Sequence, residues 1–154
     1  MKLTTQKDTT LDDDYVNIRY RELTPTIHQL IQLCENKATL LLCETHDGVS
    51  QPVDIQDIYY IEWVERKSYV YTKTAIYTLA LSLTQLEKNL PNSSFVRISR
   101  MALVNVYKIN TLTNGLNFRL TAELFNGERL IINRSYRGAL LSAISELAGR
   151  FKHE

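Results

Sequence analysis

Arginine and lysine side chains gather in the second half of the chain, where they could bind an anion. Seven cations and two glutamates lie between residues 95 and 137, and six of the cations are arginines. A planar guanidinium can hold a phosphate or the edge of a guanine base through two parallel hydrogen bonds. The pattern favours an anionic polymer as ligand, although a solvated charged surface has the same composition.

Three short segments combine these cations with hydroxyl or amide side chains. They are residues 65–68 between two expected strands, residues 97–100 at the end of a third, and residues 133–137 at a strand-to-helix junction. Arg, Lys, Asn and Ser are residue types that contact phosphates and base edges. A β domain that brought the three segments to one edge would therefore present a surface suited to nucleic acid.

Other chemistry has little support. The three histidines are isolated, the five glycines form no phosphate-binding loop, and no G-x-S-x-G motif occurs. The aspartates at 12–14 could suggest a metal site, but adjacent carboxylates in a polar tail are usually solvated. The sequence predicts no enzyme, no metal and no cofactor.

The chain has 154 residues, 44% of them hydrophobic and 23% charged, which suits one domain with a small appendage. No apolar run approaches the ~20 residues of a membrane helix, and the N-terminus lacks the apolar core of a signal peptide. We therefore expect a cytoplasmic protein whose two cysteines are reduced thiols.

Residues 1–50 are predicted to form a small acidic unit, with five basic and eight acidic residues. Apolar alternation indicates a strand over 14–22, Thr24-Pro25 opens a helix, and 39–43 reads as a second strand. One helical face is apolar and consists of Ile27, Leu30, Ile31 and Cys34. Such a face must pack on the rest of the chain, on a second copy or on another protein, so we expect a role in oligomerisation or regulation.

Residues 51–150 are predicted to be mainly β. Expected strands lie near 53–55, 58–63, 69–73, 75–79, 95–98, 108–113, 116–124 and 129–133. Asn114-Gly115 and Asn126-Gly127 indicate hairpins, a brief helix runs from Ser82 to Pro91, and a last helix runs from 134 or 135 to 149. The expected fold class is mainly β, α+β overall.

A set of motifs in this region occurs in a characteristic order and spacing. The motifs are Ile58-Tyr-Tyr-Ile-Glu62, Tyr69-Val-Tyr71, Leu83-x-x-Leu86-Glu87, Phe95-Val-Arg-Ile-Ser-Arg100, Leu103-Val-Asn105 with Ile109, Asn126-Gly-Glu128 and Asn133-Arg134-x-Tyr136. The region that they span resembles the LytTR family of bacterial DNA-binding domains over about residues 50–147. The resemblance implies an elongated stack of small antiparallel sheets that inserts loops into successive major grooves.

The resemblance also implies which residues bind DNA. Transferred position by position, the site comprises Arg66, Lys67, Ser68, Tyr69, Arg97, Ser99, Arg100, Asn133, Arg134, Ser135 and Arg137. Ser68 takes the reading position of the first loop, and Arg100 is expected to read a base. Many relatives have Ser before the third-loop arginine and Arg after it, whereas this chain has Asn133 and Ser135. Asn105 matches a family asparagine that either contributes to function or satisfies backbone groups at a turn.

The resemblance implies a sequence-specific, double-stranded DNA-binding transcription regulator that acts as a homodimer on paired sites. The chain resembles the stand-alone type without a receiver domain, which implies a small membrane protein, encoded nearby, that restrains it. Two alternatives belong to other classes. A protein-interaction adaptor would have lost specific DNA reading, and a single-strand binder would need exposed aromatics among the cations, where residues 133–137 offer only Tyr136.

Overall fold

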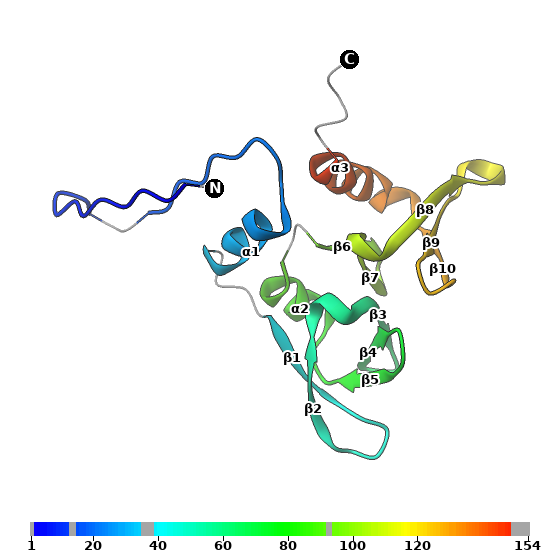
Figure 1. Cartoon of the computed structure of the whole chain (residues 1–154). Helices are drawn as coiled ribbons and strands as arrows, with labels where there is room; N and C mark the ends of the chain where they lie inside the picture. The colour runs from blue at the N-terminus through cyan, green and yellow to red at the C-terminus, as the bar shows by residue number, and fades with distance from the viewer. Residues whose placement is uncertain (1, 13–14, 35–38, 92–93, 149–154) are drawn as a thin grey trace.

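Antiparallel strands dominate the part of the chain that the structure describes. The structure is a computed structural model, and it describes all residues except 1, 13–14, 35–38, 92–93 and 149–154. The strands form a seven-stranded sheet in the order β2-β1-β5-β4-β3-β7-β6 and a three-stranded sheet in the order β10-β9-β8 (Figure 1). The expected class, mainly β and α+β overall, is confirmed.

Short connections hold each sheet together because neighbouring strands are mostly consecutive in the chain. The larger sheet contains β1 (Leu40–Glu44), β2 (Ser50–Asp54), β3 (Ile58–Val64), β4 (Lys67–Thr72), β5 (Ile76–Leu79), β6 (Phe95–Ser99) and β7 (Ala102–Asn105). The smaller sheet contains β8 (Ile109–Asn114), β9 (Leu120–Leu124) and β10 (Arg129–Ile132). The β9–β10 hairpin turns at Asn126-Gly127, where Gly127 has a φ of +87° that side-chain-free glycine adopts without strain.

Three helices accompany the sheets in the described residues. They are α1 (Pro25–Cys34), α2 (Leu83–Asn89) and α3 (Arg137–Leu147), and a 3-10 turn at Arg134–Tyr136 leads into α3. α2 packs on β3, and α3 packs against β6. The last helix was expected to continue to residue 149, which lies outside the described residues, as do positions 13 and 14 of the aspartate triplet. None of the described helices is both long enough and apolar enough to span a membrane.

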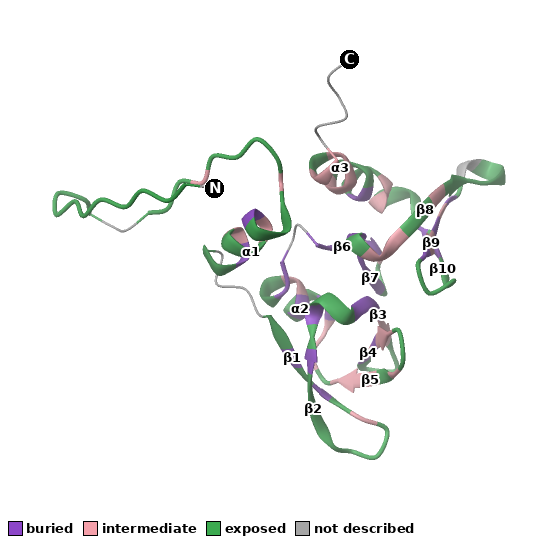
Figure 2. Ribbon diagram, in the orientation of Figure 1, coloured by how far each residue is buried: buried purple, intermediate pink, exposed green. Residues whose placement is uncertain are grey.

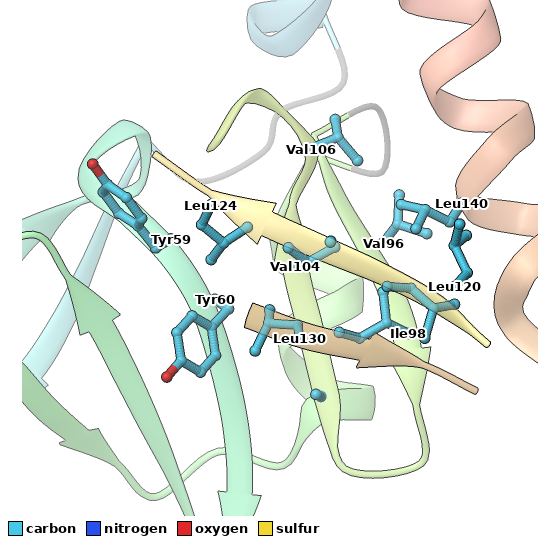
Figure 3. Packing of buried hydrophobic residues seen from close by; sticks show 13 residues of the cluster. Tyr59, Tyr60, Val96, Ile98, Val104, Val106, Leu120, Leu124, Leu130 and Leu140 are labelled. Atoms are coloured by element: carbon cyan, nitrogen blue, oxygen red, sulfur yellow. The ribbon is translucent and has the colours of Figure 1, made fainter. Parts of the chain in front are cut away.

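The central strands of the larger sheet are buried on both faces. Side chains alternate along a strand, so Tyr60 of β3 and Val104 of β7 point to one face, while Ile61 and Leu103 point to the other. The first face packs against β9, β10 and Leu140 of α3 (Figure 3). The second face packs beneath α2. The larger sheet is therefore the shared wall of two hydrophobic cores.

The structure corrects the expected strand over residues 14–22. Its described part, residues 15–22, belongs to neither sheet, and the segment runs away from the β core with exposed side chains such as Val16, 71% accessible (Figure 2). Alternation makes a strand possible, but a strand persists only where a neighbour accepts its backbone hydrogen bonds. The second expected strand of the N-terminal unit is β1, and it pairs along its length with β2.

Candidate nucleic-acid interface

The three cationic segments lie at one end of the larger sheet. Glu62 pairs with Ala102, and the Trp63 amide donates to the Met101 carbonyl at 2.8 Å, so the β3–β4 turn stands next to the β6–β7 turn. On the far side of β6, the Asn133 amide donates to the Ile98 carbonyl, also at 2.8 Å. The order across this end is thus β3–β4 turn, β6–β7 turn, and the junction between β10 and α3.

The β3–β4 turn is tight and unusual in its residues. Val64 pairs with Lys67, so only Glu65 and Arg66 connect the strands, with φ values of +49° and +67°. Two-residue hairpins favour this left-handed backbone, but glycine or asparagine usually occupies it. Each such non-glycine residue costs on the order of 1–3 kcal/mol, and outliers of this kind cluster at functional sites. Arg66 and Lys67 are both exposed at the turn.

Ser68, which was expected to contact DNA, is not exposed at the turn. Ser68 is fully buried, and its hydroxyl donates a 2.6 Å hydrogen bond to the carbonyl of Leu81. It belongs to the strand that follows the turn, where alternation directs it into the core. Tyr69, the next residue, is half-buried within β4 opposite Glu62 and Thr78. The exposed cations of this turn, rather than Ser68, are available to a ligand.

The β6–β7 turn separates Arg97 from Arg100. Arg97 is largely buried and forms an ion pair with Glu87 of α2, with 2.8 Å between Nε and Oε1. The guanidinium that was expected to contact DNA is therefore already bound within the protein. Arg100 is exposed, and Ser99 accepts a hydrogen bond from the Met101 amide at 3.2 Å. Arg100 is thus the available cation of this turn.

A hollow of about 440 Å³ lies where the β10–α3 junction meets the β8–β9 hairpin. The polar residues that line it are Ser99, Asn117, Arg119, Asn133, Arg134 and Arg137. Four of these had been predicted as site residues, and the fold brings them together from segments more than thirty positions apart. Three guanidinium groups around one hollow form a surface that an anion would neutralise.

Local hydrogen bonds hold the junction in shape. Asn133 Oδ1 accepts from the Ser135 amide at 3.3 Å and from its hydroxyl at 3.1 Å, so Ser135 is engaged with its neighbour. Arg137 donates from Nη2 to Asn114 Oδ1 at 2.8 Å, which ties the start of α3 to the end of β8. Arg134 and Arg119 are exposed, and neither has an acidic partner among the described residues.

Two groups of arginines in the β domain differ in charge pairing. In the first group, Arg97 forms an ion pair with Glu87, and Arg129 forms one with Glu123. Arg66, Arg100, Arg119 and Arg134 have no such acid beside them within the described chain. All four lie at the loop end of the domain, whereas Arg129 lies at the opposite end of β10. These four unpaired arginines are therefore gathered at one end of the β domain.

Arg119 and Asn117 were not among the predicted site residues. Arg119 counted only toward the charge of the basic stretch, although its place five residues after Asn114 and next to a hairpin signal could have suggested a loop cation. Asn105 was expected either to contribute to function or to satisfy backbone groups at a turn. It is buried, donates to the Ile58 carbonyl at 2.8 Å and accepts from the Tyr107 amide at 3.1 Å. It satisfies backbone groups at a turn.

Comparisons with known proteins identify relatives of this chain. Residues 49–145 match the family model of the LytTr DNA-binding domain. A solved LytTr DNA-binding domain from Bacillus cereus superposes with a TM-score of 0.65 at 28% identity, covering 70% of this chain and 97% of that one. The transcriptional regulatory protein YpdB of Escherichia coli K12 is 36% identical over 63 residues, which are 41% of this chain and 26% of YpdB.

The sensory transduction protein LytT of Bacillus anthracis is 31% identical over 84 residues, which cover 54% of this chain and 34% of LytT. The chain therefore matches about a third or less of the length of these curated relatives. The family match covers well over half of the chain, and a solved LytTr domain shares its fold. The chain belongs to the LytTR family of DNA-binding domains.

Proposed function

We propose that the chain is a sequence-specific transcription regulator that reads double-stranded DNA in the major groove with the loops at one end of its β domain. The observation that carries this proposal is the gathering of unpaired arginines from four separate segments on that end. Arginine side chains without an internal partner are free to bind phosphates. Their position along one end of the β domain suits a duplex, which presents a row of phosphates.

The roles within this interface follow from exposure. Arg100 projects from a tight turn and is the base-reading residue, because a guanidinium can bond both O6 and N7 of guanine. Arg66, Lys67, Arg119, Arg134 and Arg137 hold phosphates on either side of it. Ser99 and Asn133 line the hollow between these groups and fix its shape. Ser68 and Arg97 take no direct part.

Salt dependence tests the DNA-binding proposal. The purified chain first selects duplexes from a random library, and its affinity for a selected duplex is then measured over a range of salt concentrations. Five phosphate contacts predict that log K falls against log salt with a slope of about −4 to −5. A flat salt response with no selected sequence would instead favour a protein-interaction adaptor.

Substitution of Arg100 tests the reading role. Arg100→Ala should weaken binding to the selected duplex by about 1–3 kcal/mol and remove the preference at one base pair. Arg129→Ala removes the same charge from the opposite end of β10 and serves as the control. An equal loss of affinity for every duplex would make Arg100 a phosphate contact and would overturn its assignment as the base reader.

A homodimer on paired sites is part of the same proposal, and α1 is the candidate contact. Ile27 of α1 packs inward, and the ring of His28 meets Tyr107 edge-on at 5.1 Å, so α1 rests on the β domain. Leu30 and Leu33 stay exposed on α1, Leu33 at 70%. Control by a membrane protein remains a prediction of the resemblance.

Leu33→Gln in the full chain tests the homodimer. It should reduce cooperativity on two-site duplexes and leave one-site affinity unchanged. Equal cooperativity for the native chain and the variant would remove α1 from the dimer contact.

A further inference from the structure

The guanidinium of Arg97 joins α2 to the turn that carries Arg100. Its Nε donates to Glu87 Oε1 at 2.8 Å, and its Nη2 donates to Glu87 Oε2 at 3.3 Å and to Thr84 Oγ1 at 3.4 Å. The remaining nitrogen, Nη1, donates to the carbonyl oxygen of Arg100 at 3.0 Å. One side chain thus forms hydrogen bonds with two residues of a helix and with one backbone carbonyl of the turn.

The strand ladder next to this turn is irregular, so the Arg97 hydrogen bond adds to the support of the turn. Arg97 pairs with Leu103, but the next aligned pair is Ser99 with Ala102, and the register shifts between them. Such an irregularity leaves residues without regular ladder bonds. The Arg100 carbonyl is bonded by the Arg97 side chain, and the Met101 amide is bonded by the Ser99 hydroxyl. Side chains therefore orient the peptide that follows Arg100.

α2, which holds the Arg97 guanidinium, is anchored in the core. Leu83 and Leu86 of α2, and Leu90 directly after it, are buried in the core beneath the helix. The Leu81 carbonyl, just before α2, accepts the hydroxyl of Ser68 from the strand that follows the β3–β4 turn. Both loops that lie beside each other at the sheet end are thus tied to one short, anchored helix.

We propose that Arg97, oriented by Glu87, is a positioning residue that aims Arg100 at its base, and that it does not itself contact DNA. The Arg97 side chain is 20% exposed and its charge is balanced by Glu87, so little of it is available to a phosphate. Base reading demands placement of a guanidinium to within a fraction of an ångström, which a fixed peptide supplies. The inference rests on the proposed function.

Two substitutions separate positioning from charge. Arg97→Lys keeps the positive charge, but a single ammonium cannot bond both Glu87 and the Arg100 carbonyl in the fork geometry of arginine. Glu87→Gln makes the chain more positive, so an effect of charge alone would raise affinity for every duplex. The exposed pair Arg129 and Glu123 provides matched controls through Arg129→Lys and Glu123→Gln.

Arg100→Ala first identifies the base pair whose preference depends on Arg100. The measurement is then the discrimination ratio, which is the affinity for the selected duplex divided by the affinity for a duplex altered at that base pair. We expect both Arg97→Lys and Glu87→Gln to lower this ratio about tenfold, and the two controls to leave it within about twofold. The double variant Arg97→Lys/Arg100→Ala should lose no more discrimination than Arg100→Ala alone, because the two residues act as one unit.

The outcomes distinguish the inference from the function on which it rests. Absence of any base preference in the native chain would overturn the proposed function, and the inference with it. The native chain could show a base preference that Arg100→Ala removes. If both Arg97→Lys and Glu87→Gln kept that preference, the inference alone would be overturned. A uniform loss of affinity for all duplexes, together with a lowered melting temperature, would make the pair a structural ion pair and would also overturn it.

Discussion

α2 and α3 each bury a leucine completely in the β core, but their first turns are made differently. In α2 the Gln85 amide donates to Ser82 Oγ at 3.2 Å, and the Ser82 amide donates to Gln85 Oε1 at 2.8 Å. α3 begins with Arg137, has no acidic residue in its first turn, and receives no side-chain cap from Tyr136. α2 is thus closed by a reciprocal side-chain cap, whereas α3 continues from the 3-10 turn, in which the Asn133 and Arg134 carbonyls accept from the Tyr136 and Arg137 amides.

This difference indicates what each helix does. The start of a helix carries a partial positive charge, so cations there reduce its stability and an anion there increases it. The arginines at the start of α3 are therefore an arrangement that a phosphate would stabilise, beside the hollow lined by three guanidinium groups. α2 supplies no proposed contact and supports the turns from behind. We expect loss of the α2 cap to alter stability without altering the salt slope, and changes at the start of α3 to alter binding.

Removal of a buried leucine should have the largest effect on the free energy of unfolding, and the effect should be similar for the two helices. Leu86 of α2 and Leu140 of α3 are fully buried, so Leu86→Ala and Leu140→Ala should each lower the free energy of unfolding by about 2–5 kcal/mol. Urea unfolding measures both. Leu141→Ala, at a 37% exposed position of α3, is the control and should cost less than about 1 kcal/mol. A small loss from Leu140→Ala would show that α3 contributes little to the core.

Arg134, which precedes α3, should affect binding without affecting stability. Arg134→Ala should lower affinity for all duplexes and reduce the salt slope by about one, while the free energy of unfolding stays within about 0.5 kcal/mol. Arg129→Ala, whose native residue is paired with Glu123, should leave the salt slope unchanged. Equal slopes for Arg134→Ala and the native chain would separate the start of α3 from the DNA.

Ser82→Ala should have the reverse effect. Loss of its oxygen leaves the Gln85 amide without its cap, so the free energy of unfolding should fall by about 1 kcal/mol, with no change in the salt slope. Ser82→Asp retains an acceptor and should recover most of the loss. If Ser82→Ala changed the salt slope, the assignment of α2 to support alone would be wrong.

The core beneath α2 should also make stability depend on pH. Burial raises the pKa of the Cys43 thiol from 9.0 to about 11. The folded state disfavours the thiolate, so this contribution is complete below pH 9 and is lost as the pH rises toward 11, with roughly 1 kcal/mol lost by pH 10. Urea unfolding at pH 8 and pH 10 should show a smaller fall for Cys43→Ala than for the native chain. The exposed Cys34 provides Cys34→Ala as the control, and an unchanged fall in Cys43→Ala would exclude Cys43 as the source.

Local signals predicted the elements that depend on a few neighbouring residues. Ser82 indicated the start of α2, and Asn126-Gly127 indicated a hairpin that the structure confirms. Alternation over 14–22 failed because it says which face of a strand is apolar and not whether a partner strand exists. β7 was not predicted as a strand, since its four buried residues do not alternate in polarity.

Residue types and their spacing along the chain were enough to predict the family, the class of fold and the basic character of the three loop segments. Only the tertiary structure decided which cations are available. Ser68 and Arg97 carry the right chemistry at the right spacing, yet strand alternation buries one and Glu87 neutralises the other. Arg119 became part of the hollow because the β8–β9 hairpin brings it beside residues 133–137. Exposure and pairing arise between segments distant in the chain, so no local pattern records them.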